Sequence, residues 1–459
     1  MVLIWVVIYG LILLVAVVAI VAITWLSSTS VDVKAPPDDD RPPRPTRADR
    51  PLPTRATLAE ERPPPNGTHY SDGPIRPDAA PMVEVIPVSV GGVSAIWGGT
   101  GRSPDGHIWM GLCAHGHGSA QLAEYDPERR RLVARGDVIA QLRKAGKYRE
   151  GASQIKIHSK IVPGPDGQLY FTSMDEEGEN GATGSLPVWG SHLWRLRLPE
   201  RTWEHLETTK EALIAVSCAG QYVYALGYFG HVLYQYDPRN GSFRSQRVGS
   251  LGGHVSRNFF SDRRDHVYVP RLRPGRSPDD PAVVTLVEFD PRLRQVSESF
   301  LDHYLGDGQP HDSHGITGFQ HMRDGSIVFV THEGMLYRVV VPADGKGPAN
   351  VEELGHFHPE GSTYVGTLFT FSGVRYVVGV AKTRRGTFDW LCFDLMKSES
   401  SNVEIELAYP DERPIWRHLL YGSITRDDAG GFYVAGTDQH TDRPVLIKLT
   451  AELHLGNHE

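Results

Sequence analysis

A short turn-and-strand motif recurs seven times along the chain and limits its possible folds more than any other feature. In each copy a polar turn, often Asp-Gly, precedes a run of aromatic and β-branched residues. The copies are PDGHIWMGL from Pro104, PDGQLYFTS from Pro165, AGQYVYALG from Ala219, RRDHVYVPR from Arg263, RDGSIVFVT from Arg323, SGVRYVVGV from Ser372 and AGGFYVAGT from Ala429. Six intervals separate Gly106 from Gly431, about 54 residues each. A constant period of this size indicates a repeat architecture.

A second motif follows each copy of the first one. It consists of an alternating strand, a turn that often begins with Asp-Pro, and a further strand. The copies are LAEYDPERRRL from Leu122, LWRLRLPERTW from Leu193, LYQYDPRNGSF from Leu233, LVEFDPRLRQV from Leu286, LYRVVVPADGK from Leu336, LCFDLMKSESS from Leu391 and VLIKLTAELHL from Val445. Aspartate and proline favour this turn because the aspartate side chain bonds nearby backbone and proline restricts φ. With one strand before each Asp-Gly turn, every repeat contains four antiparallel strands.

Four-stranded units that repeat with this period are typical of a β-propeller. We therefore predict an all-β fold, a seven-bladed β-propeller over residues 83–459. Eight blades remain possible if residues 338–363 form a degenerate repeat. The segment Val83–Val90 has no repeat of its own, and we expect it to complete the last blade. Closing the ring in this way removes exposed sheet edges.

The rhythm of the two motifs resembles the broad β-propeller superfamily that includes virginiamycin B lyase, NHL and SMP-30-like proteins and the propeller polysaccharide lyases. The resemblance covers roughly residues 83–456. It implies the fold and not an activity, because enzymes and non-enzymes share the same blades. The sequence contains no catalytic signature of these families that could be carried over residue by residue.

The N-terminal region has the composition of a membrane segment. Residues Val2 to Trp25 carry no charge, and a helix of that length reaches ~36 Å, more than the ~30 Å hydrocarbon core of a bilayer. We predict a transmembrane anchor in residues 1–27 and a linker in residues 28–82, where ten prolines lie between Pro36 and Pro65. A cleaved signal peptide is the alternative, although no Lys or Arg precedes the apolar run. The charges that follow favour an extracytoplasmic domain, periplasmic or at the cell surface.

Composition excludes several other classes of protein. The net charge of −8 argues against a nucleic-acid partner. The three cysteines, Cys113, Cys218 and Cys392, lack CxxC spacing, so we expect buried apolar residues and not a metal or redox motif. The sequence has no P-loop, Rossmann fingerprint or GxSxG motif. Nothing therefore favours a kinase, a dehydrogenase or a serine hydrolase.

Histidines gather on one face of the predicted propeller. The loop that enters the innermost strand of a blade and the loop between its second and third strands lie on the same face. Counting back nine to thirteen residues from the turns places a histidine near the start of four innermost strands: His158, His254, His314 and His418. The other loops of that face supply His115, His117, His231, His332 with Glu333, and His440, while His311 and Asp312 precede His314.

Imidazoles that converge from several blades could bind a divalent metal. We predict His158, His254, His314 and His418 as ligands of manganese, zinc, iron, copper or calcium. Such a metal would polarise a carboxylate and lower the pKa of a bound water. Without a metal, a neutral histidine could act as a general base.

For a uronic-acid substrate these groups fit lyase chemistry, in which a base removes the proton α to a neutralised carboxylate. Propeller polysaccharide lyases use histidine, tyrosine and metal sets, and the resemblance implies the same here. The predicted catalytic residues are His158, His254, Arg257, Tyr228 and Tyr421. Lys160 and Arg417 flank the histidines, and Tyr364 occupies a rim or channel position.

Two functions remain open from these observations. The first is a monomeric, membrane-anchored enzyme, a carbon–oxygen lyase that acts on an acidic carbohydrate. The second is a non-catalytic propeller that binds a protein or glycan as an envelope scaffold, with the histidines serving only to cap strands or bond backbone. The pair His356 and His358 lies in a loop of unclear position. The acidic stretch from Met174 to Gly181 reads as a solvated loop, since it lacks the DxDxDG spacing of a calcium loop.

Overall fold

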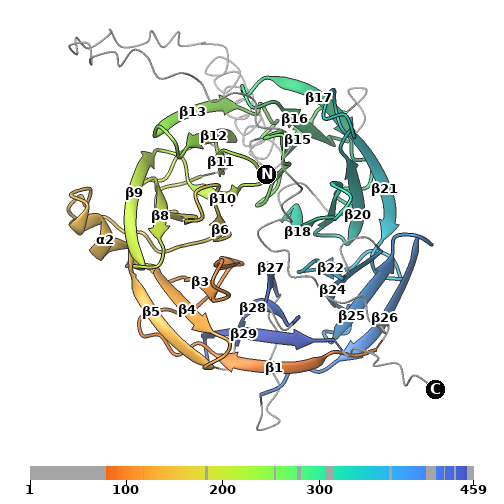
Figure 1. Cartoon of the computed structure of the whole chain (residues 1–459), viewed down its shortest axis with the longest axis horizontal. Helices are drawn as coiled ribbons and strands as arrows, with labels where there is room; N and C mark the ends of the chain where they lie inside the picture. Colours follow the sequence, from red (N-terminus) through yellow and green to blue (C-terminus); the bar gives the residue numbers. More distant parts are fainter. Residues whose placement is uncertain are drawn as a thin grey trace, which may run out of the picture. The chain divides into compact units, whose positions relative to one another are not determined.

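Seven antiparallel sheets surround a common axis in the computed structural model (Figure 1). The structure describes residues 79–451 except 117, 181–184, 253–254, 276–280, 307–313, 372–374, 410–419, 428–429 and 439–440. The predicted all-β, seven-bladed propeller is confirmed. Residues 338–356 complete the blade that begins at Ile316, so they do not form an eighth blade.

Each blade contains four strands, written here from the axis outwards. Blade 1 has β2 (Thr100–Arg102), β3 (Ile108–Leu112), β4 (Gln121–Asp126) and β5 (Arg131–Asp137). Blade 2 has β6 (Val162–Pro163), β7 (Leu169–Met174), β8 (Ser191–Arg197) and β9 (Thr202–Thr209). Blade 3 has β10 (Leu213–Ser217), β11 (Val223–Gly227), β12 (Val232–Asp237) and β13 (Ser242–Arg247). Blade 4 has β14 (Phe260–Ser261), β15 (Val267–Arg273), β16 (Val283–Phe289) and β17 (Gln295–Phe300).

The remaining blades follow the same order. Blade 5 has β18 (Ile316–His321), β19 (Ile327–Thr331), β20 (Met335–Val340) and β21 (Asn350–His356). Blade 6 has β22 (Tyr364–Val365), β24 (Tyr376–Lys382), β25 (Phe388–Asp394) and β26 (Glu399–Ile405), and β23 (Phe369–Phe371) also pairs with β24. Blade 7 has β27 (Tyr421–Arg426), β28 (Phe432–Asp438), β29 (Arg443–Thr450) and, outermost, β1 (Met82–Pro87).

Strand β1 closes the ring, as the sequence predicts. It pairs antiparallel with β29, from Met82 opposite Thr450 to Pro87 opposite Val445. The first strand of the domain thus completes the last blade, and both ends of the propeller are tied into one sheet (Figure 1). This pairing leaves no open gap between the first and last blades.

The two sequence motifs form the turns that were expected of them. The Asp-Gly turns connect the first and second strands, with positive φ at Gly106, Gly167 and Gly325. In the Asp-Pro turns the aspartate is buried, and its carboxylate accepts the backbone N–H two residues later. These pairs are Asp126 with Glu128, Asp237 with Arg239, Asp290 with Arg292 and, without proline, Asp394 with Met396.

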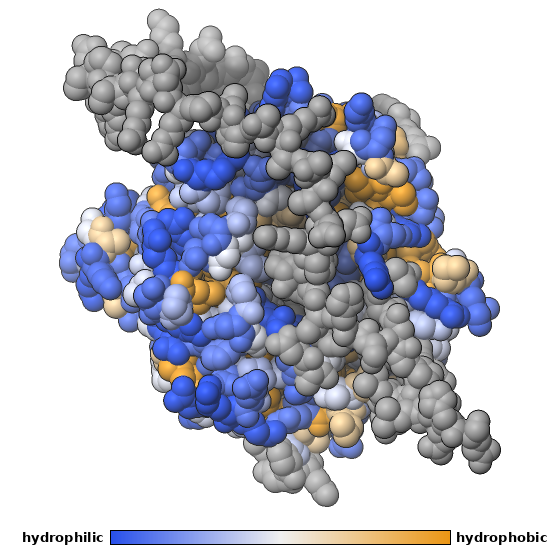
Figure 2. Space-filling view, viewed as in Figure 1, coloured by the Kyte–Doolittle hydropathy of each residue, from blue (hydrophilic) through white to orange (hydrophobic). Residues whose placement is uncertain are grey.

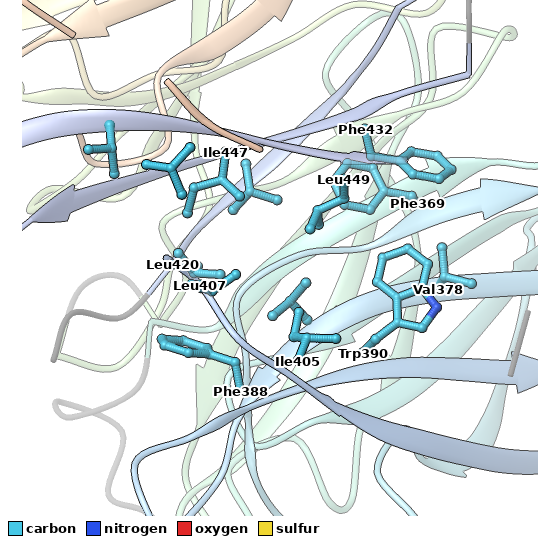
Figure 3. Close-up of a cluster of buried hydrophobic side chains, with 14 of the residues drawn as sticks. Phe369, Val378, Phe388, Trp390, Ile405, Leu407, Leu420, Phe432, Ile447 and Leu449 are labelled. Carbon is cyan, nitrogen blue, oxygen red and sulfur yellow. The ribbon is translucent and has the colours of Figure 1, made fainter. Parts of the chain in front are cut away.

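The hydrophobic core lies between neighbouring blades. Figure 3 shows the cluster between blades 6 and 7, where Phe369, Trp390 and Phe432 lie together. The ring centres of Phe369 and Phe432 are 4.7 Å apart. Twisted sheets pack face to face through such large side chains, and this packing holds the loops of adjacent blades in fixed positions.

One short helix, α2 (Val138–Lys144), interrupts the strands of the described residues. It follows β5 at the outer side of the ring (Figure 1), and the side chain of Asp137 caps it by accepting the N–H of Ala140. Within the described ranges no helix has the length and apolar character needed to cross a bilayer. The predicted anchor, residues 1–27, and most of the predicted linker lie outside those ranges.

Candidate functional site

Three predicted site residues meet at one end of the propeller axis. His158, Arg257 and His314 lie on the loops that enter the innermost strands of blades 2, 4 and 5. The backbone N–H of Arg257 donates to the carbonyl of His314 at 3.1 Å. The charge of Arg257 also acts on both imidazoles, as their pKa values show. We refer to His158, Arg257 and His314 as the axial cluster.

The histidines of the axial cluster are neutral at pH 7. Burial, followed by the charges of Arg257 and Lys156, lowers the pKa of His158 well below its usual value of 6.5. Burial and Arg257 lower the pKa of His314 to about 3. Desolvation and a nearby positive charge both oppose protonation of an imidazole. Each ring therefore keeps one nitrogen that can accept a proton or a hydrogen bond.

His314 is held in place by a neighbour that lies on the loop between β19 and β20. Its ring stacks on His332, with centroids 4.8 Å apart and planes inclined by 19°. The backbone N–H of His314 donates to Nδ1 of His332 at 3.0 Å. Since Nδ1 accepts, a neutral His332 carries its proton on Nε2. Tyr364 on β22 meets both rings edge-on, at 5.0 Å from His332 and 6.3 Å from His314.

Two lysines extend the positive charge around the axial cluster. The Nζ atom of Lys160 lies 5.2 Å from the ring of Phe319 on β18, so the side chain reaches from blade 2 to blade 5. Lys160 is only 7% exposed, and burial lowers its pKa to about 7. Lys156 is paired with Glu176 and lies 5.5 Å from the ring of Trp97. Burial also lowers the pKa of Lys156.

The acidic stretch from Met174 to Gly181 is more ordered than the expected solvated loop. Asp175 is buried and accepts the N–H of Glu177, whose own carboxylate accepts the indole N–H of Trp189 at 2.6 Å. Glu179 is half-buried, and burial raises its pKa to about 7. Its Oε2 atom has no hydrogen-bond partner among the described residues. Sequence reasoning missed Glu179 because nothing in its spacing separates it from surface carboxylates.

The other predicted site residues have varied surroundings. Tyr228 packs edge-on against Phe229 and on the core between blades 3 and 4. Tyr421 begins β27, but its side chain is outside what the structure describes. The predicted ligands His254 and His418 lie outside the described residues, as do His117, His311, Asp312, Arg417 and His440.

Several alternative candidates have structural roles. The Nε2 atom of His358 lies 2.9 Å from the carboxylate of Asp389, and both residues are buried. Cys113 and Cys392 are buried as expected, while Cys218 is partly exposed. Burial raises the pKa of Cys113 to about 12, so it stays a thiol. His115 is exposed and His231 is buried.

The surroundings of His158 and His314 do not favour a bound cation. Arg257 and Lys156 place positive charges beside them, and these charges repel a divalent metal as they repel a proton. Within the described ranges no group of three or more His, Cys, Asp or Glu side chains could hold a metal. The four-histidine metal site stays a prediction, since two of its ligands are outside those ranges.

A shallow depression adjoins the axial cluster between blades 5 and 6. Its volume is about 320 Å³, and its lining consists of Glu333, Ser362, Thr363, Tyr364, Lys382, Thr383 and Arg384. Figure 2 shows that the described surface on the viewed side of the propeller is mostly hydrophilic, with hydrophobic residues in separate areas. Both observations fit polar ligands better than an extended apolar partner.

Comparison with known proteins supports the fold and leaves the activity open. No family model and no curated protein matches the sequence. A catalytically inactive virginiamycin B lyase from Staphylococcus aureus, solved with quinupristin, is 12% identical with a TM-score of 0.49, over 81% of this chain and 99% of that chain. The extracellular domain of BT4673 from B. thetaiotaomicron is 13% identical with a TM-score of 0.47, over 80% of this chain and 40% of that chain. Kuenenia stuttgartiensis hydrazine synthase is 9% identical with a TM-score of 0.48, over 80% and 98%. The resemblance to the broad β-propeller superfamily is confirmed, with seven blades present in this chain.

Proposed function

We propose that this protein binds an acidic carbohydrate at the axial cluster and cleaves it as a carbon–oxygen lyase. The observation that supports the proposal is the position of Arg257, a guanidinium beside two imidazoles that are kept neutral. A guanidinium binds a carboxylate through paired, charge-assisted hydrogen bonds. A neutral imidazole is the form of histidine that can remove a proton.

Substrate binding would itself prepare the base. A carboxylate bound to Arg257 offsets the positive charge that holds the histidine pKa values down, so those values rise. A base whose pKa approaches the working pH transfers protons more effectively. His158 or His314 then removes the proton on the carbon α to the carboxylate, while Arg257 stabilises the charge that develops on the carboxylate oxygens.

The elimination is completed by loss of the glycosidic oxygen. The electron pair of the broken C–H bond forms a carbon–carbon double bond, and the β carbon–oxygen bond breaks. The departing oxygen needs a proton, and Lys160 is our candidate donor, because its pKa of about 7 leaves it partly protonated at neutral pH. The products are an unsaturated uronate and a free hydroxyl group, so atoms and charge balance.

The experiment uses the full chain in detergent with a panel of polyuronates. Ultraviolet absorbance of the unsaturated product measures turnover, and calorimetry measures binding. We expect Arg257→Ala, His158→Ala and His314→Ala to lose turnover by 100-fold or more, on the order of one general acid–base contribution. Arg143→Ala on helix α2, at the outer side of the ring, is the control and should keep activity.

The scaffold alternative gives a different result in the same experiment. If no polyuronate is turned over and a glycan or envelope protein still binds the three variants, the protein is a non-catalytic binder. If neither binding nor turnover is found for any polyuronate, the proposal for the axial cluster fails. Elemental analysis of the full chain, purified without chelator, tests the predicted metal, and loss of bound metal in His158→Ala would support it.

We also propose that residues 1–27 anchor the protein and that the propeller lies outside the cytoplasm. The uncharged run from Val2 to Trp25 and the proline-rich segment after it support this arrangement. Protease added to intact cells or spheroplasts should then cut the propeller away from the membrane fraction. Protection of the propeller until the membrane is lysed would contradict this orientation.

A further inference from the structure

The depression between blades 5 and 6 shares one wall with the axial cluster. Tyr364 lines the depression, and the same ring contacts His314 and His332 edge-on. The tyrosine hydroxyl donates to the carbonyl of Leu420 at 2.8 Å, which fixes the ring between blades 6 and 7. A ligand that fills the depression therefore lies next to a ligand bound at the axial cluster.

The lining of the depression carries charges that the described protein does not neutralise. Arg384 is exposed and forms no ion pair with any described residue. Glu333 accepts a hydrogen bond from the Ser362 hydroxyl at 2.7 Å and likewise forms no ion pair within the described ranges. A free guanidinium can take a carboxylate in bidentate fashion, and a carboxylate beside hydroxyl groups can accept hydrogen bonds from sugar hydroxyls.

The size of the depression also suits a small polar group. Its volume of about 320 Å³ is at the lower end of the ~300–1,000 Å³ range of small-molecule sites. Its residues come from two blades, since Glu333 lies on the loop after β19 and the others belong to blade 6. Inter-blade packing therefore sets the spacing between Glu333 and Arg384.

We propose that this depression is a subsite for a second acidic sugar unit, so that the substrate is an oligomeric polyuronate. The inference rests on the proposed function, because it places the unit next to the one that is cleaved at the axial cluster. The carboxylate of the second unit binds Arg384, and its hydroxyl groups contact Glu333 and Thr363. An oligomer then gains contacts that a single uronate cannot make.

Calorimetry on the full chain tests the subsite with galacturonate and tetragalacturonate as probes. The variant is Arg384→Gln, and the matched control is Arg385→Gln, an exposed arginine one residue later that does not line the depression. We expect Arg384→Gln to weaken tetragalacturonate binding about tenfold or more and to leave galacturonate binding unchanged, as for loss of a charged hydrogen bond. Arg385→Gln should change neither affinity.

The outcomes separate this inference from the proposed function. If Arg257→Ala weakens both probes and Arg384→Gln weakens neither, the axial cluster stands and the subsite is overturned. If Arg384→Gln weakens the tetramer and Arg257→Ala weakens neither probe, the depression binds acidic sugar and the axial function is overturned. Equal weakening by Arg384→Gln and Arg385→Gln would reduce the effect to general surface charge and overturn the subsite.

Discussion

Removal of the charge on Arg257 should change the titration of the two histidines beside it. In Arg257→Gln we expect the pKa of His314 to rise from about 3, and that of His158 to rise as well, because one positive charge that opposes protonation is lost. Both values should stay below 6.5, since burial remains. Titration of the imidazole C–H signals by NMR measures the change. Unchanged values would show that burial alone keeps the rings neutral.

Asp265 offers a second test at a single residue, because it joins two blades from a left-handed conformation. Its φ is 61°, a region where most other Asp-Gly turns place glycine. Its carboxylate accepts the backbone N–H groups of Gln221 and Tyr222, at 2.8 and 3.1 Å, on the equivalent turn of blade 3. Asp265→Gly removes the strain but leaves two donors without their acceptor.

We expect Asp265→Gly to lower the free energy of unfolding by about 1–3 kcal/mol, the usual penalty for unsatisfied partly buried groups. Asp265→Asn keeps one carbonyl acceptor and tolerates positive φ, so it should fall between the wild type and the glycine variant. Urea denaturation gives the order. A glycine variant as stable as the wild type would mean that relief of strain outweighs the two hydrogen bonds.

Among the elements, β1 has the largest effect expected from a small change. Val85 on β1 lies opposite Ile447 and is buried in the core between blades 6 and 7. Val85→Asp places a carboxylate in this apolar core, which should destabilise the fold by several kcal/mol, on the order of 3 or more. Thermal unfolding of the full chain measures the effect.

The matched control for β1 is its neighbour Glu84, which points to the other face and pairs with Arg130. Glu84→Gln should cost roughly 0–1 kcal/mol, as for an exposed ion pair. If Val85→Asp were as mild as Glu84→Gln, pairing of β1 with β29 would not be needed for stability.

The repeated aspartate turns predict how stability depends on acid. The backbone N–H and guanidinium of Arg129 lower the pKa of Asp126 to about 2. Hydrogen bonds from Arg239 and Arg375 likewise lower the pKa values of Asp237 and Asp394. Below the unfolded value of ~3.9 the unfolded chain takes up protons first, so the stability present above pH 4 is lost as the pH falls towards 2.

Melting temperatures measured between pH 5 and pH 2.5 test this dependence. The wild type should lose stability steadily over that range, and Asp126→Asn should be less stable at pH 5 but show a shallower slope. Asp126 titrates in only one of the four turns, so the change of slope is small and needs replicate scans. An unchanged slope in Asp126→Asn would contradict the low pKa of that group.

On the level of the entire propeller, the candidate site is assembled from loops that are distant in the chain. His158, Arg257 and His314 come from three different blades, and Lys160 reaches Phe319 on the innermost strand of blade 5. The region around the axis is therefore crossed by side chains, and a change in the packing of any of these blades moves part of the site. Residues far from the cluster, such as Asp265, should then affect function through stability.

Much of the architecture follows from local sequence alone. Seven Asp-Gly turns, the Asp-Pro turns and the unmatched strand before the first repeat predict the number of blades and their closure, because each is a short-range pattern with its own hydrogen bonds. Counting back from a turn also places His158 and His314 on the correct face, since the strand length fixes that distance. Helix α2 and the extra strand β23 were not predicted, as both are short.

The chemistry of the site depends on contacts between distant segments, and these are absent from any local pattern. The neutral state of His158 and His314 arises from burial and from Arg257, which lies about a hundred residues after the first and fifty before the second. The stack of His314 on His332, the raised pKa of Glu179 and the depression beside Tyr364 likewise need neighbouring blades. Turn and strand patterns act over a few residues, whereas desolvation and charge act across space, so the blades can be read from the sequence and the site chemistry requires the folded ring.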